Sequence, residues 1–450
     1  MNAHEKTEII ERAKSAFAVY KKSSRYQRAR ILAGIAQGLE QRKNDFVRSM
    51  VQEAKKPVTL AELEVSRAIQ TFTVASEEAK RYGGDVIPLD IDVASQAFLP
   101  AVSYFFPKGI ILGITPFNFP LNLVAHKVAP ALAVGAAIMI KPAPQAPGCA
   151  LLLKEVFDSV CKTEKFIPYT DTLQVFPCSN EVAEKLVTDP AVAVVSFTGS
   201  TKVGFHIQKT AIGKKVLLEL GGNAAVIVHE DADLKRAANR VAVGSFVYAG
   251  QTCISVQRVF VHQNIFNNFE KNLLEETAKI KTGDTTDPTV TVGPVIDEVA
   301  AERIQNWIED AVKSGATVLT GGKRLQGAKF ATILPTVLKN VKTTEKISCE
   351  EVFGPVVILD SYSEKQEAIR KVNDSRFGLQ AGIFTNDHKF IQQAVQELEV
   401  GGVLINEIPT FRADHMPYGG VKESGLGREG LKFAMEEFSE RKTVLTWIGA

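Results

Sequence analysis

A cysteine and an upstream glutamate have the residue types that a covalent acyl-transfer reaction needs. Cys253 lies in the segment 248–255, and Glu219 comes shortly before a Gly-Gly pair. A cysteine thiolate attacks a carbonyl carbon readily, and the thioester that follows needs an activated water before the product can leave. Taken alone, Cys253 could equally be a buried core cysteine. The motifs around it favour a nucleophile, with Glu219 as its general base.

Seven short motifs accompany this pair along the chain. They are Thr115-Pro116-Phe117-Asn118-Phe119-Pro120, Ile140-Lys141-Pro142-Ala143, Phe197-Thr198-Gly199-Ser200, Leu218-Glu219-Leu220-Gly221-Gly222, Gly250-Gln251-Thr252-Cys253, Glu351-Val352-Phe353-Gly354-Pro355 and Met416-Pro417-Tyr418-Gly419-Gly420-Val421-Lys422-Glu423-Ser424-Gly425. In this order they resemble the motifs of the aldehyde dehydrogenase superfamily. The resemblance runs from about residue 7 to the C-terminus.

The resemblance implies a role for each catalytic position. Cys253 would add to an aldehyde as a thiolate, and the oxyanion of the thiohemiacetal needs hydrogen-bond donors. The side-chain amide of Asn118 matches the family's oxyanion donor, together with the backbone N–H of Cys253. Glu219 would activate the water that hydrolyses the thioester. Lys127 matches a lysine that supports the nucleophile's surroundings, although a lysine that extends its amino group to solvent fits the sequence as well.

The implied cofactor is NAD or NADP. Its expected binding residues are Thr115, Pro116, Phe117, Lys141, Pro144, Gly199, Ser200, Glu351 and Phe353. Lys141 matches the residue that binds the adenine-side ribose, and Ser200 would hold the pyrophosphate at a helix N-terminus. Glu351 would bind the hydroxyls of the nicotinamide ribose, with Phe353 packed beside it.

Two departures from the family pattern concern this cofactor. Pro144 stands where relatives that prefer NAD often carry a glutamate, and proline neither accepts a hydrogen bond there nor repels a 2′-phosphate. We therefore expect mixed specificity or a preference for NADP. The glycine-rich loop usual after the preceding strand is replaced by Pro177-Cys178-Ser179-Asn180, which alters the expected adenine end of the site.

The residues of the substrate pocket are predicted only from the resemblance to the family. Its expected residues are Phe119, Leu123, His126, Thr252, Ile254, Arg412 and Tyr418. His126 and Arg412 replace bulky aromatic residues of relatives that oxidise apolar aldehydes. This polar pair predicts a small polar or anionic aldehyde, such as lactaldehyde or glycolaldehyde. The segment 411–418 is similar to the branch that holds lactaldehyde and phosphonoacetaldehyde dehydrogenases. Arg412 is either a substrate anchor or the partner of Asp414 in a surface salt bridge.

The elements that must position these residues alternate between helices and short apolar strands. Residues 7–80 have apolar positions at three- and four-residue spacing, which predicts helices. Strands are expected at Ile110–Ile114, Ala137–Ile140, Thr172–Phe176, Val192–Phe197, Val216–Leu218 and Ala224–Val228. Apolar runs of this kind are typical of parallel strands covered on both faces. The sequence thus predicts an open α/β sheet whose ligand lies beyond the strand carboxyl ends.

A second α/β unit is expected over residues 220–420. Its predicted helices and strands are Leu234–Val247, Phe266–Ile280, Val299–Ser314, Thr317–Leu319 and Val356–Leu359. The fold class is therefore α/β, with a Rossmann-like cofactor domain (1–84 and 108–219) and a catalytic domain (220–433). By resemblance, segments 85–107 and 434–450 form a small β oligomerisation domain. Within them, residues 95–106 and 442–447 are expected to be extended, and the partner would be a second copy, in a homodimer or homotetramer.

One glycine motif is expected not to bind a dinucleotide. Gly425-Leu426-Gly427-Arg428-Glu429-Gly430 satisfies the pattern G-x-G-x-x-G, yet no predicted strand runs into it and no βαβ unit follows. We interpret it as a loop that leads into a helix at Leu431–Phe438.

Composition excludes several other classes of protein. Hydrophobic residues at 45% and charged residues at 23% are ordinary globular values, and a formal net charge of +2 argues against binding nucleic acid or a membrane surface by charge. Five cysteines without a Cys-x-x-Cys pair favour neither a disulfide framework nor a zinc site, and no metal site is expected. The N-terminus lacks the pattern of a secretory signal, so we expect a cytoplasmic protein.

Three alternatives to aldehyde oxidation remain open at this point. A CoA-acylating relative would pass the thioester to CoA, but such enzymes usually lack a general base at the position of Glu219. A non-catalytic binding protein would be expected to have lost Cys253, Asn118 or Glu219, and all three are present. A thiol esterase would follow if the changes at Pro144 and 177–180 abolished cofactor binding.

Overall fold

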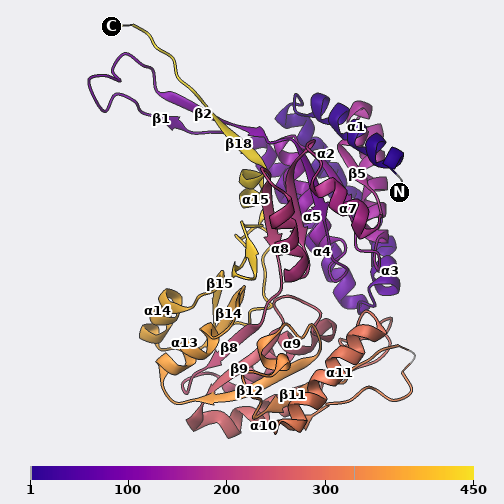
Figure 1. Ribbon diagram of the computed structural model, residues 1–450, viewed down its shortest axis with the longest axis vertical. Helices are drawn as coiled ribbons and strands as arrows, with labels where there is room; N and C mark the ends of the chain where they lie inside the picture. Colours follow the sequence, from indigo (N-terminus) through magenta and orange to yellow (C-terminus); the bar gives the residue numbers. More distant parts are fainter. Residues whose placement is uncertain (1–2, 329, 450) are drawn as a thin grey trace.

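The computed structural model describes residues 3–328 and 330–449 and begins with four helices (Figure 1). They are α1 (Ala3–Tyr20), α2 (Arg25–Gln41), α3 (Lys43–Glu53) and α4 (Val58–Arg81). The start of α2 is fixed by a capping box, in which the Ser24 hydroxyl accepts from the backbone N–H of Gln27 and the Gln27 side chain accepts from that of Ser24. The predicted helical character of residues 7–80 is confirmed.

A six-stranded sheet follows these helices. Its order is β17 (Gly425–Leu426), β7 (Lys215–Glu219), β6 (Val192–Thr198), β3 (Ile110–Ile114), β4 (Ala137–Lys141) and β5 (Leu173–Val175). Five of these strands run parallel, and only β17 is antiparallel to its neighbour. Five of the predicted strands are confirmed here to within two residues at each end, whereas Ala224–Val228 forms part of the second sheet. Residue Thr172 belongs instead to a 3₁₀ turn, Ile167–Thr172.

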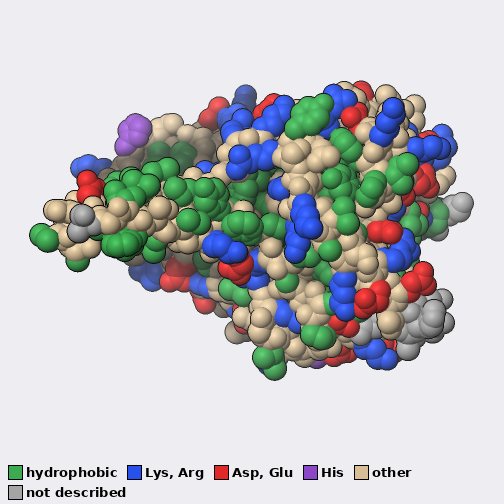
Figure 2. All heavy atoms as spheres, turned by 90° about the horizontal axis from the view of Figure 1, so that it is seen from above, with side chains coloured by type: hydrophobic (Ala, Val, Ile, Leu, Met, Phe, Trp, Pro, Cys, Tyr) green, Lys and Arg blue, Asp and Glu red, His purple; other side chains and the backbone are tan. Residues whose placement is uncertain are grey.

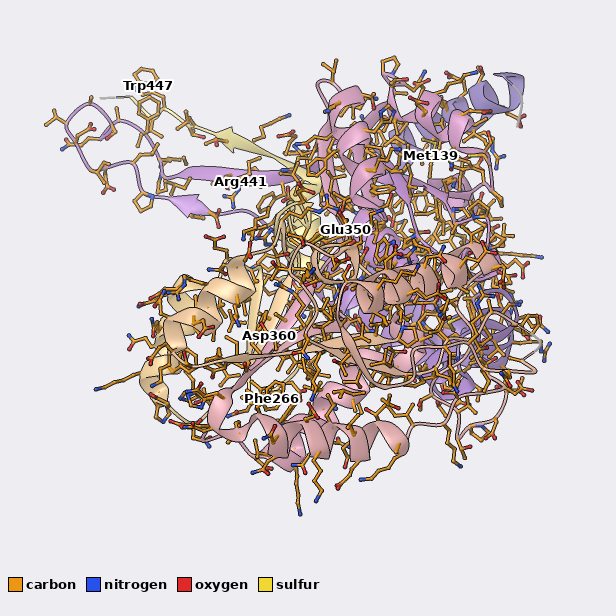
Figure 3. All side chains as sticks on the ribbon, turned by 60° about the horizontal axis from the view of Figure 1, so that its bottom comes forward. Met139, Phe266, Glu350, Asp360, Arg441 and Trp447 are labelled. Atoms are coloured by element: carbon orange, nitrogen blue, oxygen red, sulfur yellow. The ribbon has the colours of Figure 1, made fainter. Side chains whose placement is uncertain are left out.

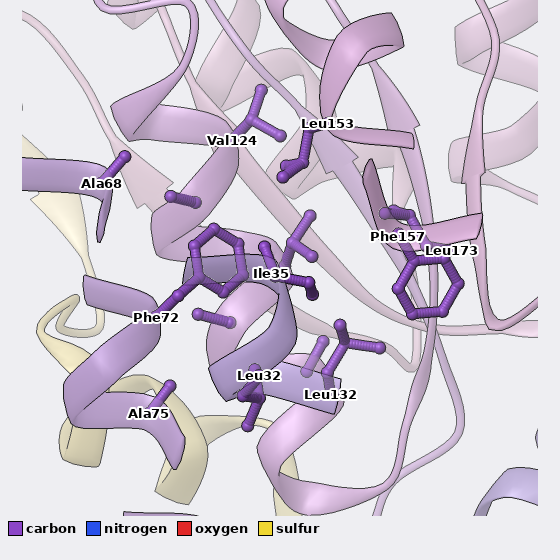
Figure 4. Close-up of a cluster of buried hydrophobic side chains, with 14 of the residues drawn as sticks. Leu32, Ile35, Ala68, Phe72, Ala75, Val124, Leu132, Leu153, Phe157 and Leu173 are labelled. Carbon is purple, nitrogen blue, oxygen red and sulfur yellow. The ribbon is translucent and has the colours of Figure 1, made fainter. Parts of the chain in front are cut away.

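Helices cover this sheet on both faces. They include α5 (Asn122–Val134), α6 (Gly148–Thr163), α7 (Asn180–Val187) and α8 (Thr201–Thr210). Figure 4 shows the core on one face, where Leu32 of α2 and Phe72 of α4 pack against Leu132 of α5 and Phe157 of α6, all fully buried. Burial on both faces explains why these strands are apolar without alternation.

A seven-stranded sheet forms the second α/β unit. Its order is β10 (Thr317–Thr320), β11 (Thr336–Lys339), β12 (Val356–Tyr362), β9 (Val256–His262), β8 (Ala224–Val228), β14 (Gln380–Phe384) and β15 (Gly402–Ile405). Its helices are α9 (Leu234–Phe246), α10 (Phe266–Ala278), α11 (Glu298–Lys313), α12 (Lys346–Cys349), α13 (Lys365–Asn373) and α14 (His388–Glu397). Figure 3 labels Asp360 on β12, within this sheet, and Phe266 at the start of α10. The mixed α/β class is confirmed.

A long arm projects from the body of the molecule (Figure 1). It contains the sheet β1 (Val86–Ile87), β2 (Ala101–Pro107) and β18 (Ser439–Val444), in which β18 is an edge strand. Expected extended structure at 95–106 begins only at Ala101, because residues 90–97 form turns. Figure 2 shows hydrophobic side chains gathered along this arm, and Figure 3 places Trp447 near its end.

The glycine motif at 425–430 leads into α15 (Leu431–Glu437), as predicted. Its first two residues are not a plain loop, however, since Gly425 and Leu426 pair with Glu219 and Leu218 as strand β17. The proposed domain boundaries at 84/85, 219/220 and 433/434 stay predictions. In the described part of the chain, no helix is both long and apolar enough to cross a membrane.

Candidate active site

A cavity of about 310 Å³ lies beyond the carboxyl ends of β3, β6 and β7. Loops that precede β9 and β12 close it from the second α/β unit. Parallel α/β sheets bind their ligands at this edge. The expected site residues on its wall are Pro116, Phe117, Asn118, Phe119, Leu123, Gly199, Ser200, Glu219, Thr252, Cys253, Ile254, Glu351, Phe353, Arg412 and Tyr418. The structure thus brings most of the predicted residues into one place.

The segment before Cys253 is a tight, strained turn. Tyr248 and Ala249 have φ angles of 56° and 52°, and Gly250 follows with 67°. Left-handed conformations cost a residue with a side chain roughly 1–2 kcal/mol. At Gly250 a side chain is also excluded by space, because a Cβ atom would lie 2.1 Å from the carbonyl oxygen of Gly354. The surrounding packing therefore fixes the direction in which Cys253 enters the cavity.

The Cys253 side chain is half-buried at the cavity wall. Its desolvation raises the pKa of the thiol to about 12. The Sγ atom lies 3.2 Å from the hydroxyl oxygen of Tyr418. The resting group is consequently a protonated thiol in contact with a phenol.

Asn118 is fixed beside the turn that carries Cys253. Its Nδ2 donates to the carbonyl oxygen of Gln251 at 3.0 Å, and its Oδ1 accepts from the backbone N–H of Phe119 at 3.1 Å. A primary amide has a second N–H. The predicted oxyanion donor is thus bonded to Gln251, which lies two residues before the predicted nucleophile.

Glu219 ends β7 and is buried against the cavity. Among the residues that the structure describes, its Oε2 has no hydrogen-bond partner. Burial raises the pKa of Glu219 well above its ordinary value, and the negative charge of Glu429 adds to the effect. Burial opposes ionisation of Glu429 too, but the positive charges of Lys127 and Arg412 hold its pKa well below the ordinary value. The pKa values of the two carboxyl groups are therefore shifted in opposite directions, and Glu429 ionises more readily than Glu219.

Lys127 does not reach solvent, so the alternative of a solvent-extended lysine is wrong. Its side chain is 1% exposed, and its Nζ donates to Ser196 at 3.0 Å, Thr198 at 2.8 Å and Glu429 at 3.0 Å. Lys127 is outside the cavity wall and acts on the site through Glu429.

Arg412 lies inside the protein and not on its surface. Its side chain is 7% exposed, and its Nη2 donates to Glu429 at 3.1 Å and to Nδ1 of His126 at 3.0 Å. The guanidinium carbon sits 3.7 Å from the centre of the Tyr418 ring. The alternative of a surface salt bridge with Asp414 is wrong, because Asp414 binds other groups.

His126 supports Arg412 from behind and is not part of the cavity wall, which corrects the expected pocket. Its Nε2 binds Asp414 at 2.9 Å, and its Nδ1 accepts from Arg412. Asp414 also accepts from Arg67 at 2.7 Å. Burial alone would raise the pKa of Asp414, but the hydrogen bond from His126 and the charge of Arg67 bring it well below the ordinary value.

The expected cofactor residues divide into two groups. Glu351, Phe353 and Phe117 line the same cavity. The ring centres of Phe117 and Phe353 are 5.9 Å apart, in an edge-to-face contact. Burial raises the pKa of Glu351 to about 7, and its Oε1 accepts from the backbone N–H of Gly222 at 3.0 Å. Ser200 is the N-cap of α8 and lines the cavity.

The other group lies farther along the sheet edge, outside the cavity wall. Thr115 is buried and donates its N–H to the carbonyl oxygen of Lys141. The Lys141 amino group lies 3.3 Å from Oδ1 of Asn180, in the altered loop, and burial lowers its pKa. Pro144 is exposed.

Sequence reasoning missed several residues of the wall. Arg67 of α4 and Glu429 are the charged ones, and Asn122, Thr198 and Thr410 are the polar ones. Arg67 lies in a stretch read only as helix, and Glu429 lies in the glycine motif set aside as a loop. No spacing pattern marks either of them, because both reach the site through tertiary packing.

Curated relatives match almost the whole chain. A 3-sulfolactaldehyde dehydrogenase from Priestia aryabhattai is 43% identical over 423 residues, which are 94% of this chain and 86% of the relative. A lactaldehyde dehydrogenase from Methanococcus maripaludis is 37% identical over 438 residues, 97% of this chain and 91% of the relative.

Solved structures agree with the fold. Aldehyde dehydrogenase 21 from Physcomitrella patens, in complex with its reaction product succinate, gives a TM-score of 0.95 at 37% identity and covers 100% of this chain and 91% of its own. The glyceraldehyde-3-phosphate dehydrogenase GapN from Methanocaldococcus jannaschii, complexed with NADP, gives 0.94 at 37% identity with coverage of 99% and 95%. A betaine aldehyde dehydrogenase from Staphylococcus aureus, complexed with NAD+, gives 0.92 at 29% identity with coverage of 99% and 88%.

The model of the aldehyde dehydrogenase family matches residues 1–444. That span includes the cavity and every motif named above. The chain belongs to the aldehyde dehydrogenase family.

Proposed function

We propose that this NAD(P)-dependent aldehyde dehydrogenase oxidises a small aldehyde with a hydroxyl and an acidic group, through a covalent intermediate on Cys253. The Cys253 sulfur adds to the aldehyde carbon and gives a thiohemiacetal. The free N–H of Asn118 and the backbone N–H of Cys253 stabilise its oxyanion. Loss of hydride leaves a thioester.

Glu219 then acts as the general base for hydrolysis. It has a free carboxylate oxygen and shares the cavity wall with Cys253. Because its pKa is raised, Glu219 ionises less readily than an exposed glutamate, and it must be ionised before it can take a proton from water. Lys127 and Arg412 lower the pKa of Glu429 and keep it charged, and that charge raises the pKa of Glu219. The released product is the carboxylic acid.

The residues present fit a nicotinamide dinucleotide. The Ser200 side chain makes no hydrogen bond within the start of α8, so the helix N-terminus is open to an anion from the cavity. Glu351 offers a carboxylate for ribose hydroxyls on the same wall. When bound there, the cofactor supplies the hydride acceptor.

The observation that carries the substrate class is a set of three unsatisfied polar atoms. Within residues 3–328 and 330–449, Glu219 Oε2, Asn122 Oδ1 and Arg412 Nε are buried without a hydrogen-bond partner. All three residues line the cavity. Buried polar atoms are nearly always paired, so a substrate that pairs them gains affinity. Two acceptors and one cationic donor suit a molecule with a hydroxyl and an anionic group.

The test is the appearance of reduced cofactor with a panel of aldehydes. We expect lactaldehyde, 3-sulfolactaldehyde and succinic semialdehyde to be oxidised better than propionaldehyde, which cannot pair these atoms. Cys253→Ala should abolish turnover, whereas Cys349→Ala, which changes an exposed cysteine, should not. Efficient oxidation of propionaldehyde alone would contradict the proposed substrate class. A rate that depends on added CoA would instead favour the CoA-acylating alternative.

For the cofactor we propose mixed specificity with a preference for NADP. Support comes from Pro144, which is exposed and uncharged beside the cofactor lysine Lys141. Measurement of kcat/KM with both cofactors decides this. A value for NAD that exceeds the value for NADP by about tenfold or more would reject the preference.

We also propose that the chain associates with a second copy through its arm. Strand β18 is an edge strand, and Leu445, Trp447 and Ile448 next to it are 59%, 67% and 61% exposed. Unpaired strand edges with apolar side chains are prone to pair with another chain. Light scattering should show a dimer or tetramer, and Trp447→Asp should shift the mass toward the monomer. A monomeric mass for the wild type would exclude the association.

A cytoplasmic location is proposed from the five free cysteines.

A further inference from the structure

The phenol of Tyr418 lies in direct contact with the Cys253 sulfur. The two atoms are 3.2 Å apart, within hydrogen-bond distance for sulfur. The Tyr418 ring is 3% exposed and packs with Ile254 and Leu379 in a small apolar cluster. A phenol in such surroundings does not exchange partners freely with water.

The position of Tyr418 is fixed from two sides. Its backbone N–H donates to the carbonyl oxygen of Glu429 at 3.0 Å, and the N–H of Glu429 returns a bond of 2.7 Å. The guanidinium carbon of Arg412 lies over the ring, 3.7 Å from its centre. A cation on the face of a phenol polarises its O–H and makes it a better donor.

From this arrangement we infer that Tyr418 is a catalytic residue, whose hydroxyl donates a hydrogen bond to the thiolate of Cys253 and holds the sulfur toward the aldehyde carbon. The inference rests on the proposed role of Cys253 as nucleophile. Tyr418 keeps its own proton throughout. The proton that leaves the thiol goes to a base on the same wall, for which Glu219 is the candidate once it is ionised.

The thiolate needs such a donor because of its other neighbours. The carboxylates Glu219 and Glu351 both disfavour a negative sulfur, whereas Arg412 favours it. Burial raises the pKa of the thiol, and of these influences only the bond from Tyr418 acts through direct contact. When the sulfur bonds to carbon it loses its charge, so the hydrogen bond is strongest before the attack and weaker after it. Tyr418 therefore tunes the first step and not the hydrolysis.

The experiment is the rate constant of Cys253 alkylation by iodoacetamide in the full-length protein at one fixed pH near neutrality, followed by peptide mass spectrometry. Tyr418→Phe keeps the ring against Arg412 and removes only the hydroxyl. We expect the rate constant to fall by about tenfold to a hundredfold, because losing one hydrogen bond to a charged group lowers the thiolate fraction by that factor. Tyr362→Phe is the matched control, because this buried tyrosine binds His229 and not the thiol. Its rate constant should equal that of the wild type.

A second variant keeps the test decisive if Tyr418→Phe does not fold. Site-specific 3-fluorotyrosine at position 418 retains the shape and strengthens the donor, so the rate constant of alkylation should exceed that of the wild type. An unchanged rate constant with either Tyr418 variant would overturn the inference. Alkylation of Cys253 that leaves aldehyde oxidation intact would instead reject Cys253 as the nucleophile, which is a different result.

Discussion

Lys56 and Glu64 form a buried ion pair that holds the turn bearing Asn118. Both side chains are 1% exposed. The Lys56 amino group also donates to the carbonyl oxygen of Asn118 at 2.8 Å, and Glu64 accepts from the backbone N–H groups of Leu121 and Asn122 at 2.9 and 3.0 Å. The pair thus fixes the carbonyl group of the proposed oxyanion donor and the backbone that follows it.

Removing one member of this pair should damage both stability and turnover. Lys56→Met leaves an unpaired buried carboxylate, so the free energy of unfolding should fall by about 3–5 kcal/mol. With the Asn118 turn released, kcat should fall more than KM rises. Denaturant unfolding and steady-state kinetics measure the two effects. Lys154→Met, at a partly exposed pair with Asp158, should change neither by much; equal losses in both variants would contradict the role given to Lys56.

Glu429→Gln should move the acid limb of the hydrolysis step to lower pH. The pKa of Glu219 is raised by burial and further by the charge of Glu429. Without that charge, Lys127 and Arg412 act on Glu219 uncompensated, so its pKa falls and the base form appears earlier as pH rises. The pH profile of acyl-enzyme hydrolysis measures this. A limb that stays in place would mean that the charge of Glu429 does not raise the pKa of Glu219.

Cofactor affinity should increase as pH rises through about 7. Burial raises the pKa of Glu351 to about 7, and only its charged form is a strong acceptor for ribose hydroxyls. The raised pKa also affects stability. Between the ordinary pKa of 4.5 and the raised pKa of about 7, Glu351 binds more protons in the native state than in the unfolded state. Its contribution to the free energy of unfolding therefore falls as pH rises across that window. Quenching of protein fluorescence by the cofactor gives the dissociation constant at each pH. Glu351→Gln should bind more weakly and lose the pH dependence.

Arg412→Leu should separate acidic from neutral substrates. If its free Nε–H binds the anionic group, KM for an acidic aldehyde should rise about tenfold to a hundredfold. KM for propionaldehyde should change little. Steady-state kinetics with both substrates checks this, and unchanged KM for the acidic aldehyde would remove Arg412 as the anchor. Arg30→Leu, at an exposed pair with Glu164, is the control for a general loss of charge.

Gly222→Ala should be poorly tolerated although it adds only a methyl group. A Cβ atom at Gly222 would lie 2.1 Å from the carbonyl oxygen of Cys253. The loop that carries Cys253 would have to move, at a cost of about 1–3 kcal/mol in stability. Thermal unfolding and activity measure the effect. Gly83→Ala meets nothing closer than 3.8 Å and should be neutral; similar losses in both would contradict the steric argument.

Complete burial alone does not make a strand visible in the sequence. Ile110–Ile114, an almost wholly apolar run, matches β3 at both ends. The equally buried β9 (Val256–His262) was not predicted, because Gln257 and Arg258 interrupt its apolar run. The strands β14 (Gln380–Phe384) and β15 (Gly402–Ile405) were not predicted either. Both contain glycine, and in β14 the Cβ of Gly382 would lie 2.5 Å from the carbonyl oxygen of Glu407. Close backbone packing selects glycine there and masks the strand signal.

The site shows the same division. Cys253, Glu219 and Asn118 stand in motifs whose local geometry carries them to one cavity, so their neighbourhood could be predicted. His126 could not be placed, because whether a histidine lines a pocket or supports an arginine depends on Asp414, far away in the chain. Arg67 was missed for the same reason, since its partner Asp414 is likewise distant.

The arm and the active site are mechanically continuous. Glu429 is followed at once by α15, which packs on α5 with Leu431 and Met435 buried, and α15 runs directly into β18. A force applied to β18 is therefore transmitted through α15 to Glu429, whose charge acts on Glu219. Affinity tags, fusions or truncations at the C-terminus of this protein will act as catalytic perturbations, and an N-terminal tag is the safer choice for kinetic work.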